Sequence, residues 1–297
     1  MVREAIASVL AQHGADYELI VVDDGSTDGT IDELAPHAAH HGYRLIRAAH
    51  RGPAGARNLG AAAARGEFVA FLDSDDLWMP TKLARQLAFM RARPSLSISQ
   101  CDEHWTRNGR RVNPGLRHRK QAGDFFAASL RTCLVSPSAV IMRTALFHAL
   151  GGFDEGLAAC EDYDLWLRIG MHEQIGLLEE TLVVRRAGHP DQLSATTPAL
   201  DRFRIIALMK LLAGKELTAA RRSAVCDVLI EKCAIYGGGL ERRGRDDAAR
   251  LCRSIVRQAA SWRAAPDATL EESIAVMRAA VHNEHVAAAT EAMEVVR

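Results

Sequence analysis

The sequence lacks an excess of charge of either sign. Its 297 residues include 37 Lys and Arg and 37 Asp and Glu, so the formal net charge is zero. Proteins that bind nucleic acid usually carry a surplus of basic residues to meet the phosphate backbone. This balance therefore gives no support to a nucleic-acid partner. Basic residues do gather in one stretch, 107–120, which we interpret as a solvated loop in preference to a binding surface.

Two further features are missing. None of the six cysteines stands in a C-x-x-C pair, which argues against a zinc site or a disulfide framework and favours a reduced, cytoplasmic setting. No apolar run approaches the ~20 residues of a membrane-spanning helix, and no signal peptide precedes the first helix. We expect a cytoplasmic protein without a transmembrane segment, and peripheral attachment at the inner face of the membrane remains open.

The first half of the chain alternates between strand-like and helix-like patterns. The strands are expected at 18–22, 43–48, 67–72 and 96–101. Short apolar runs of this kind suit parallel strands covered on both faces, and helical patterns separate them. The sequence therefore predicts an α/β fold with a mainly parallel open sheet flanked by helices. In such sheets, ligands bind beyond the carboxyl ends of the strands.

From about Leu200 onward the chain is expected to be α-helical, rich in Ala and Arg, and without a catalytic constellation. We expect the run Gly237–Gly239 to separate two of these helices. The predicted division is a first domain at 1–198 and a helical region at 199–297.

Asp73-Ser74-Asp75 follows the apolar run 68–72. Alternate residues of a strand point the same way, so the two carboxylates can face one pocket. Hard oxygen ligands of this type suit Mg²⁺ or Mn²⁺. The alternative interpretation is a polar turn that caps the next helix.

Two other segments follow strand-like or glycine-rich stretches. Asp23 and Asp24 end a predicted strand, where a carboxylate can accept a hydrogen bond from a nucleobase or a ribose, or can simply form an Asx turn. Arg57 follows the segment Gly52–Gly55. Helix N-termini and arginines both favour anions, although an exposed helix arginine would explain this residue as well.

The last two candidates lie further along the chain. Glu161 and Asp162 begin a predicted helix, where acidic residues gain ~0.3–1 kcal/mol from the helix dipole without any catalytic role. The functional interpretation is that one of them is a general base for a hydroxyl. Beyond a predicted strand, Arg185 and Arg186 are candidates for stabilising a diphosphate, with Arg186 the chosen one, and His189 is a candidate metal ligand or a structural or exposed histidine.

Taken in order, these pieces resemble the family 2 glycosyltransferases, which have the GT-A fold. The matching segments are 18–30, 52–60, 66–76, 151–155, 161–168 and 189–194. The resemblance covers residues 1–195 and does not extend to the helical tail. It implies that the first domain binds a nucleotide-sugar.

The resemblance implies an inverting, metal-dependent transferase of the kind used in polysaccharide biosynthesis. Its donor would be a nucleoside-diphosphate sugar, and its acceptor a saccharide, a lipid-linked molecule or a protein. The cofactor would be Mg²⁺ or Mn²⁺, which neutralises the departing nucleoside diphosphate.

The family pattern also implies roles for individual residues. Asp162, beside Glu161, would deprotonate the acceptor hydroxyl. Asp75 would bind the metal, and Asp73 would approach the ribose or the metal. Either Asp23 or Asp24 would contact the nucleobase, and Arg57 would lie near the nucleotide.

The sequence departs from the family pattern at its start. Family members open with an apolar strand and a short loop before the first helix, whereas Met1 here leads directly into that helix. Either the start codon is assigned too late, which is the interpretation that we favour, or the chain is truly truncated. Without that strand, two neighbouring strands would lose backbone partners, close the gap or pair with another chain.

Two rival functions remain open. A sugar-phosphate nucleotidyltransferase also uses metal-bound carboxylates on an α/β sheet, but the Glu161-Asp162 pair argues against it. A degenerate protein that binds a nucleotide-sugar without transferring it would explain the absent first strand.

Overall fold

The computed structural model describes residues 1–113, 115–189, 192 and 196–295. The chain divides into two compact units, Met1–Thr196 and Thr197–Arg297. Within the described residues, no helix is both long enough and apolar enough to cross a bilayer.

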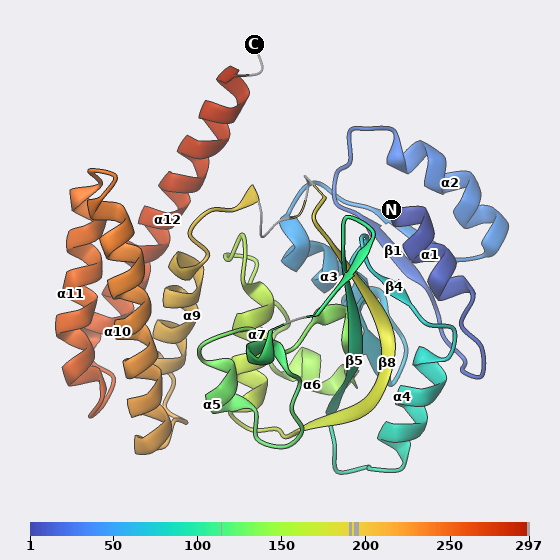
Figure 1. Ribbon diagram of the computed structural model, residues 1–297, viewed down its shortest axis with the longest axis horizontal. Helices are drawn as coiled ribbons and strands as arrows, with labels where there is room; N and C mark the ends of the chain where they lie inside the picture. The colour runs from blue at the N-terminus through green and yellow to red at the C-terminus, as the bar shows by residue number, and fades with distance from the viewer. Residues whose placement is uncertain (114, 190–191, 193–195, 296–297) are drawn as a thin grey trace. The chain divides into compact units, whose positions relative to one another are not determined.

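The first unit alternates helices with strands, as the sequence indicated (Figure 1). Its helices are α1 (Val2–Leu10), α2 (Thr30–His41), α3 (Gly52–Ala63), α4 (Lys82–Arg91), α5 (Phe126–Ser129), α6 (Thr144–Ala149) and α7 (Glu161–Gly170), with 3₁₀ turns η1 (Leu116–His118) and η2 (Pro137–Ala139). Its strands are β1 (Ile20–Asp23), β2 (Arg44–Arg47), β3 (Phe68–Ala70), β4 (Leu77–Trp78), β5 (Ile98–Arg107), β6 (Arg110–Val112), β7 (Val140–Arg143) and β8 (Ile175–Ala187).

The strands form two sheets. β1 and β2 pair in parallel, and a larger sheet runs in the order β3-β7-β5-β8-β4, with β6 added to β5. The α/β class is confirmed, but the expectation of mainly parallel strands is wrong for the larger sheet. Among the described strands of that sheet, only β5 and β8 run parallel, and the other pairs are antiparallel. An apolar run shows that a strand is covered, not which way its partner runs.

β1 and β3 lie in different sheets, and no pairing joins them in the described part of the chain. β3 is the edge strand of the larger sheet, and β1 is bonded to β2 alone. Three outcomes were expected for these two neighbouring strands: lost backbone partners, a closed gap, or pairing with another chain. The structure shows the first, because among the described strands β1 and β3 each lack a partner on one side.

Apolar packing holds the strand ends in place. One core cluster surrounds Phe71 and Trp166, where the aromatic rings of Phe71, Phe147 and Phe153 meet edge-on or tilted, with centroids 5.3–5.6 Å apart. Such geometry is favourable for aromatic rings. This cluster joins α3, β3, β7 and α7, so it fixes the end of β3 relative to the start of α7.

The second unit contains α9 (Asp201–Ala213), α10 (Ala219–Glu241), α11 (Asp246–Trp262) and α12 (Ala268–Val295). The expectation that Gly237–Gly239 would separate two helices is wrong, because all three glycines lie inside α10. A Cβ on Gly237 would stand 3.1 Å from the Cβ of Cys252 on α11. Glycine here allows close helix packing and does not end the helix.

Candidate active site

Three carboxylates meet in the turn that follows β3. Asp73, Asp75 and Asp76 each offer an oxygen within 4.8 Å of the others. The turn is closed by a 3.0 Å hydrogen bond from the Asp76 N–H to the Asp73 carbonyl. The sequence placed Asp73 and Asp75 on one side of a strand, whereas a turn brings them together. It also adds Asp76, to which no role had been assigned.

Asp76 is the buried member of this cluster. Its carboxylate accepts hydrogen bonds from the Ser138 hydroxyl at 2.7 Å and from the Arg186 N–H at 2.9 Å. Burial, together with the charges of Asp73 and Asp75, raises the pKa of Asp76 to about 7, although the two hydrogen bonds oppose the rise. A divalent cation would relieve this repulsion, so the donor set fits a hard metal ion such as Mg²⁺ or Mn²⁺.

His189 reaches the same cluster. Its Nε2 lies 2.8 Å from Oδ2 of Asp75, while its Nδ1 is buried without a hydrogen-bond partner among the described residues. The histidine therefore lies beside Asp75, and its role as a metal ligand stays a prediction. Of the segment that follows, Pro190, Asp191, Leu193 and Ser194 lie outside the described residues.

Arg57 on α3 connects the cluster to the start of α7. One nitrogen of its guanidinium lies 2.7 Å from Asp73, and the other lies 2.5 Å from Glu161. Burial alone would lower the pKa of Arg57, but the two carboxylates raise it overall. The guanidinium is thus occupied by protein carboxylates, and it joins the acidic turn to the start of α7, where Glu161 is 104 residues from Arg57 in sequence.

The two acidic residues at the start of α7 have different surroundings. Glu161 is buried against Arg57, and burial together with the Asp162 charge raises the pKa of Glu161 to about 7. Asp162 is half-buried, and its Oδ2 accepts a 3.4 Å hydrogen bond from the thiol of Cys133. Burial and the Asp162 charge raise the pKa of that thiol. Asp162 forms no ion pair with any described residue, so it is the more available proton acceptor.

Asp23 and Asp24 also differ in whether their carboxylates have partners within the protein. The Asp24 carboxylate accepts backbone hydrogen bonds from Arg51 at 2.7 Å and Gly52 at 2.9 Å, at the start of α3, and lies 2.9 Å from His50. Asp23 is buried, and its Oδ2 has no partner in the described residues. Asp24 therefore anchors the loop before α3, while Asp23 retains an unsatisfied acceptor.

Arg186 makes contacts within the protein. Its side chain donates to the Asp75 carbonyl and pairs with Glu4 of α1 at 2.6 Å, in addition to the backbone bond to Asp76. These contacts fix the acidic turn against β8 and α1. The prediction that Arg186 binds the nucleotide-sugar stays a prediction, and the structure gives the residue a supporting position.

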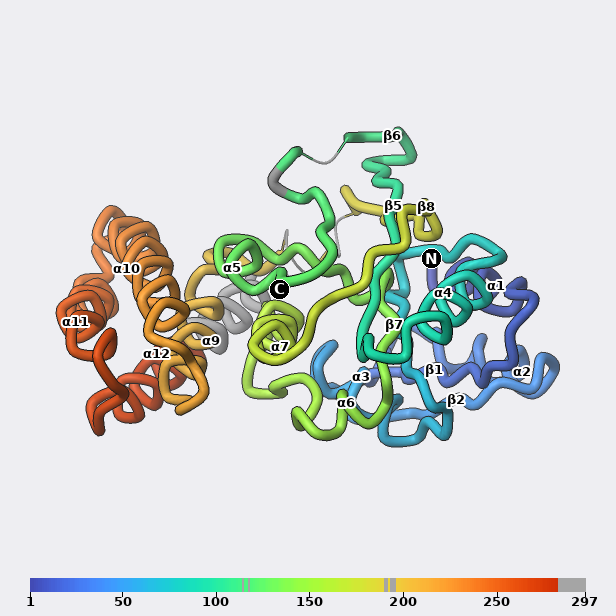
Figure 2. The backbone as a smooth tube through the Cα atoms, turned by 90° about the horizontal axis from the view of Figure 1, so that it is seen from below, coloured from blue at the N-terminus to red at the C-terminus, as the bar shows by residue number. Residues whose placement is uncertain are grey.

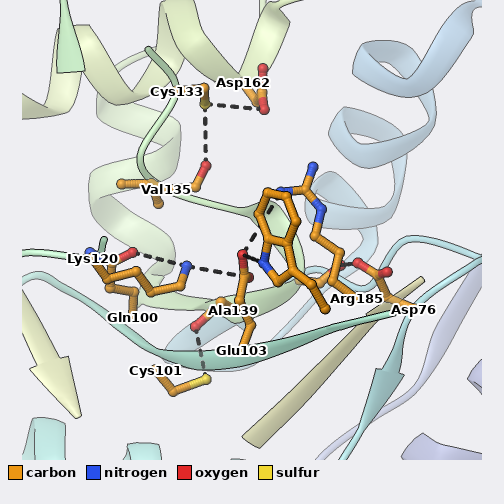
Figure 3. A network of polar contacts seen from close by, with 12 residues as sticks. Asp76, Gln100, Cys101, Glu103, Lys120, Cys133, Val135, Ala139, Asp162 and Arg185 are labelled. Carbon is orange, nitrogen blue, oxygen red and sulfur yellow. Dashed lines mark hydrogen bonds and ion pairs between the residues drawn. The ribbon is translucent and has the colours of Figure 1, made fainter. Parts of the chain in front are cut away.

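Arg185 lies on the opposite face of β8; the sequence named it beside Arg186 but chose Arg186 as the residue that binds the nucleotide-sugar. Its guanidinium lies 4.7 Å from the centre of the Trp105 ring and 3.8 Å from Glu103, and its side chain is 39% exposed. Burial lowers the pKa of Arg185, but the charges of Glu103, Asp76 and Asp73 raise it overall. Figure 3 shows Arg185 between Asp76 and the Cys133–Asp162 pair. The alternation of side chains along a strand predicts that Arg185 and Arg186 lie on opposite faces of β8. It does not show which of them faces the site.

Known proteins share sequence similarity with this chain. Residues 1–150 match the family described as Glycosyl transferase family 2. An uncharacterised glycosyltransferase of Rickettsia conorii is 32% identical over 179 residues, covering 60% of this chain and 29% of the relative. Escherichia coli WfgD, named UDP-Glc:α-D-GlcNAc-diphosphoundecaprenol β-1,3-glucosyltransferase, is 32% identical over 57% of this chain and 64% of its own length.

Solved structures share the fold. The crystal structure of Staphylococcus aureus TarS residues 1–349 in complex with UDP superposes with a TM-score of 0.62 over 92% of this chain and 86% of that one, at 20% identity. The chain spans less than a third of the length of the Rickettsia relative, 29%.

Proposed function

The chain belongs to glycosyl transferase family 2, and from that premise we propose that it transfers a sugar from a nucleoside-diphosphate sugar to an acceptor hydroxyl with inversion. The observation that carries the proposal is the convergence of two acidic segments. The carboxylates after β3 and those at the start of α7 are joined by Arg57, which binds Asp73 and Glu161 at once. One segment suits a metal–diphosphate, and the other suits a base.

The acidic turn would hold Mg²⁺ or Mn²⁺. Asp75 and Asp73 are its proposed first ligands, with His189 beside Asp75 and with Asp76 held against Ser138. When bound, the cation supplies charge neutralisation for the diphosphate of the donor. The residues of the chain keep the ligands in place: Arg186 holds the backbone of the turn, and Arg57 holds Asp73.

Asp162 is the proposed base. Its carboxylate is half-buried and free of ion pairs among the described residues, so it can accept the proton of the attacking hydroxyl. Cys133 donates to Oδ2 and orients the group. Inversion needs a single displacement with one base opposite the leaving group, and no protein nucleophile is required.

The donor would be held at two further points. Asp23 has a buried carboxylate oxygen without a partner, which suits a hydrogen bond from a nucleobase N–H. Arg185, at the inner face of β8, would face the departing diphosphate. The UDP bound by the structurally similar TarS supports a nucleoside diphosphate as the leaving group.

The acceptor is proposed to be a saccharide carried on a lipid diphosphate. The name of the Escherichia coli relative states such an acceptor, and that relative is aligned over 64% of its length. An acceptor of this class also fits a part in polysaccharide biosynthesis.

A second candidate is binding of a nucleotide-sugar without transfer. It is favoured by the separation of β1 from β3, because β1 ends at Asp23 and has β2 as its sole partner among the described strands. The two candidates differ in turnover and not in donor binding.

Calorimetric titration with UDP and Mn²⁺ separates the steps. Wild-type protein should bind UDP in a metal-dependent way, and Asp75→Ala should remove that dependence. Release of UDP from UDP-sugars in the presence of a lipid-linked acceptor then tests transfer. Unaltered metal-dependent binding in Asp75→Ala would reject the ligand role, and binding without any UDP release would favour the second candidate.

A further inference from the structure

The β5–β6 hairpin projects beyond the sheet to which it belongs (Figure 2). Asn108 and Gly109 form its turn with φ of 49° and 74°, the left-handed pair that matches the twist of a two-residue hairpin. Trp105 pairs with Val112, and the 3₁₀ turn η1 follows. The hairpin is therefore a defined element and not a loop of unspecified course.

The arginines near the tip of this hairpin have no partners among the described residues. Arg107, Arg110 and Arg111 are exposed, and none of them forms an ion pair or a hydrogen bond through its side chain with a described residue. No Asp or Glu occurs between Glu103 and Asp124. The protein as a whole carries no net charge, so this element is a local concentration of positive charge.

The pairing register places two of these like charges opposite each other, which destabilises the hairpin. Arg107 lies directly opposite Arg110 across the hairpin. Like charges in opposed positions of an antiparallel pair are destabilising. An anionic surface outside the protein would turn this cost into a gain, because it would attract both side chains.

An apolar side chain accompanies the arginines. Leu116 in η1 is 91% exposed, the highest value among the exposed large hydrophobic residues of the described chain. Arginines alone would suit any polyanion. Arginines with a projecting leucine suit the boundary between lipid headgroups and acyl chains, where an apolar side chain is buried while cations meet phosphates.

The base of this element is fixed to the first unit beside the candidate site. Lys120, which ends the basic stretch, is buried 3.3 Å from Glu103 on β5. The His118 ring lies 5.3 Å from the Trp105 ring, and Trp105 carries Arg185 over its face. The orientation of the hairpin is thereby tied to Arg185.

We propose that this basic hairpin, with Leu116 of η1, docks on an anionic phospholipid membrane. Docking would hold the site near the bilayer surface, where a lipid-linked acceptor carries its saccharide. This last consequence rests on the proposed transferase function, whereas docking itself does not.

Cosedimentation of the full chain with vesicles tests the proposal. The vesicles contain phosphatidylcholine alone or phosphatidylcholine with phosphatidylglycerol. The chain should bind only the anionic vesicles, and binding should weaken with salt. Each arginine near an anionic surface adds about fivefold to the affinity, so the triple variant Arg107→Gln, Arg110→Gln, Arg111→Gln should lose about a hundredfold. Leu116→Ser should lose about tenfold.

A matched control removes the same charge elsewhere. Arg91, Arg245 and Arg257 are exposed arginines outside the hairpin, and their triple replacement by Gln should leave vesicle binding unchanged. Equal losses in the two triple variants, or no binding to anionic vesicles, would overturn the proposal. A third result would also overturn it: the chain binds a soluble polyphosphate as tightly as it binds vesicles, and Leu116→Ser has no effect on vesicle binding. That result would show an anion site without membrane contact. None of these measurements uses donor or metal, so they stand apart from the test of transfer.

Discussion

Arg185 and Arg186 are adjacent in the sequence and face opposite sides of β8. Arg185 lies over Trp105 and points toward the acidic turn and Cys133, while Arg186 holds the backbone of that turn and pairs with Glu4. Two residues of one type thus occupy different environments only because side chains alternate along a strand.

This difference predicts opposite phenotypes for one substitution. Arg185→Gln should lower kcat about 100-fold, because a positive group aimed at the leaving diphosphate is lost, and should change thermal stability little. Arg186→Gln should destabilise the protein by about 1–2 kcal/mol through the lost contacts to Asp75 and Glu4. Steady-state kinetics and thermal denaturation of both variants check this. A kcat loss in Arg186→Gln with normal stability and none in Arg185→Gln would reverse the assignment.

The start of α7 gives a second matched pair. Asp162→Asn should lower turnover by about 10³-fold with UDP and Mn²⁺ affinity retained, because only the proton acceptor is removed. Glu161→Ala should instead lower the free energy of unfolding by about 3 kcal/mol, because Arg57 would keep a buried charge with one partner fewer. Single-turnover assays and denaturant unfolding separate the two effects. Full turnover in Asp162→Asn would exclude it as the base.

The sequence predicted most elements of the first unit, because hydrophobic period and turn residues are local properties. The strands at Ile20–Asp23 and Arg44–Arg47 lie where these patterns placed them. The direction of pairing in the larger sheet did not follow from such patterns. It depends on which distant segment lies alongside, as with β3 and β7, whose paired residues Phe68 and Arg143 are far apart in the chain.

The candidate site shows the same limit. Motifs pointed to Asp73, Asp75 and Asp162, since each ends or begins an element. The contacts that organise them join remote segments: Ser138 binds Asp76 across 62 residues, and Arg57 binds Glu161 across 104. No local pattern specifies such pairs, so Asp76 and Ser138 were not assigned from the sequence, and Arg185 could not be distinguished there from Arg186.

The glycines of α10 yield a third prediction, and it concerns packing in the second unit. A methyl group on Gly238 would meet nothing closer than an arginine nitrogen at 3.7 Å, so Gly238→Ala should stabilise the helix by about 0.5–1 kcal/mol. The same change at Gly237 would press against Cys252 at 3.1 Å and should cancel that gain or destabilise. Chemical denaturation of the two variants measures the difference. Equal stabilisation by both would mean that α10 and α11 are not in close contact there.

The buried acids give a fourth prediction, on pH and metal. The pKa of Asp76 is raised from near 4 to about 7, chiefly by burial. Between these values the folded protein holds a proton that the unfolded chain has released. The contribution of Asp76 to the free energy of unfolding therefore falls as pH rises from about 4 to 7 and stays low above that.

A cation bound to the ionised carboxylates should offset this loss. Without metal, the stability difference between wild-type protein and Asp76→Asn should shift in favour of the variant as pH rises from 5 to 8, and Mn²⁺ should raise the wild-type Tm more at pH 8 than at pH 5. The variant serves as the control, because acids elsewhere with lowered pKa values, such as Glu103, give the opposite trend in both proteins. Thermal denaturation with EDTA or with Mn²⁺ across this range measures both effects. An Mn²⁺ effect that is the same at both pH values would contradict a metal site built on these carboxylates, since protons and cation would then not compete for the same oxygens.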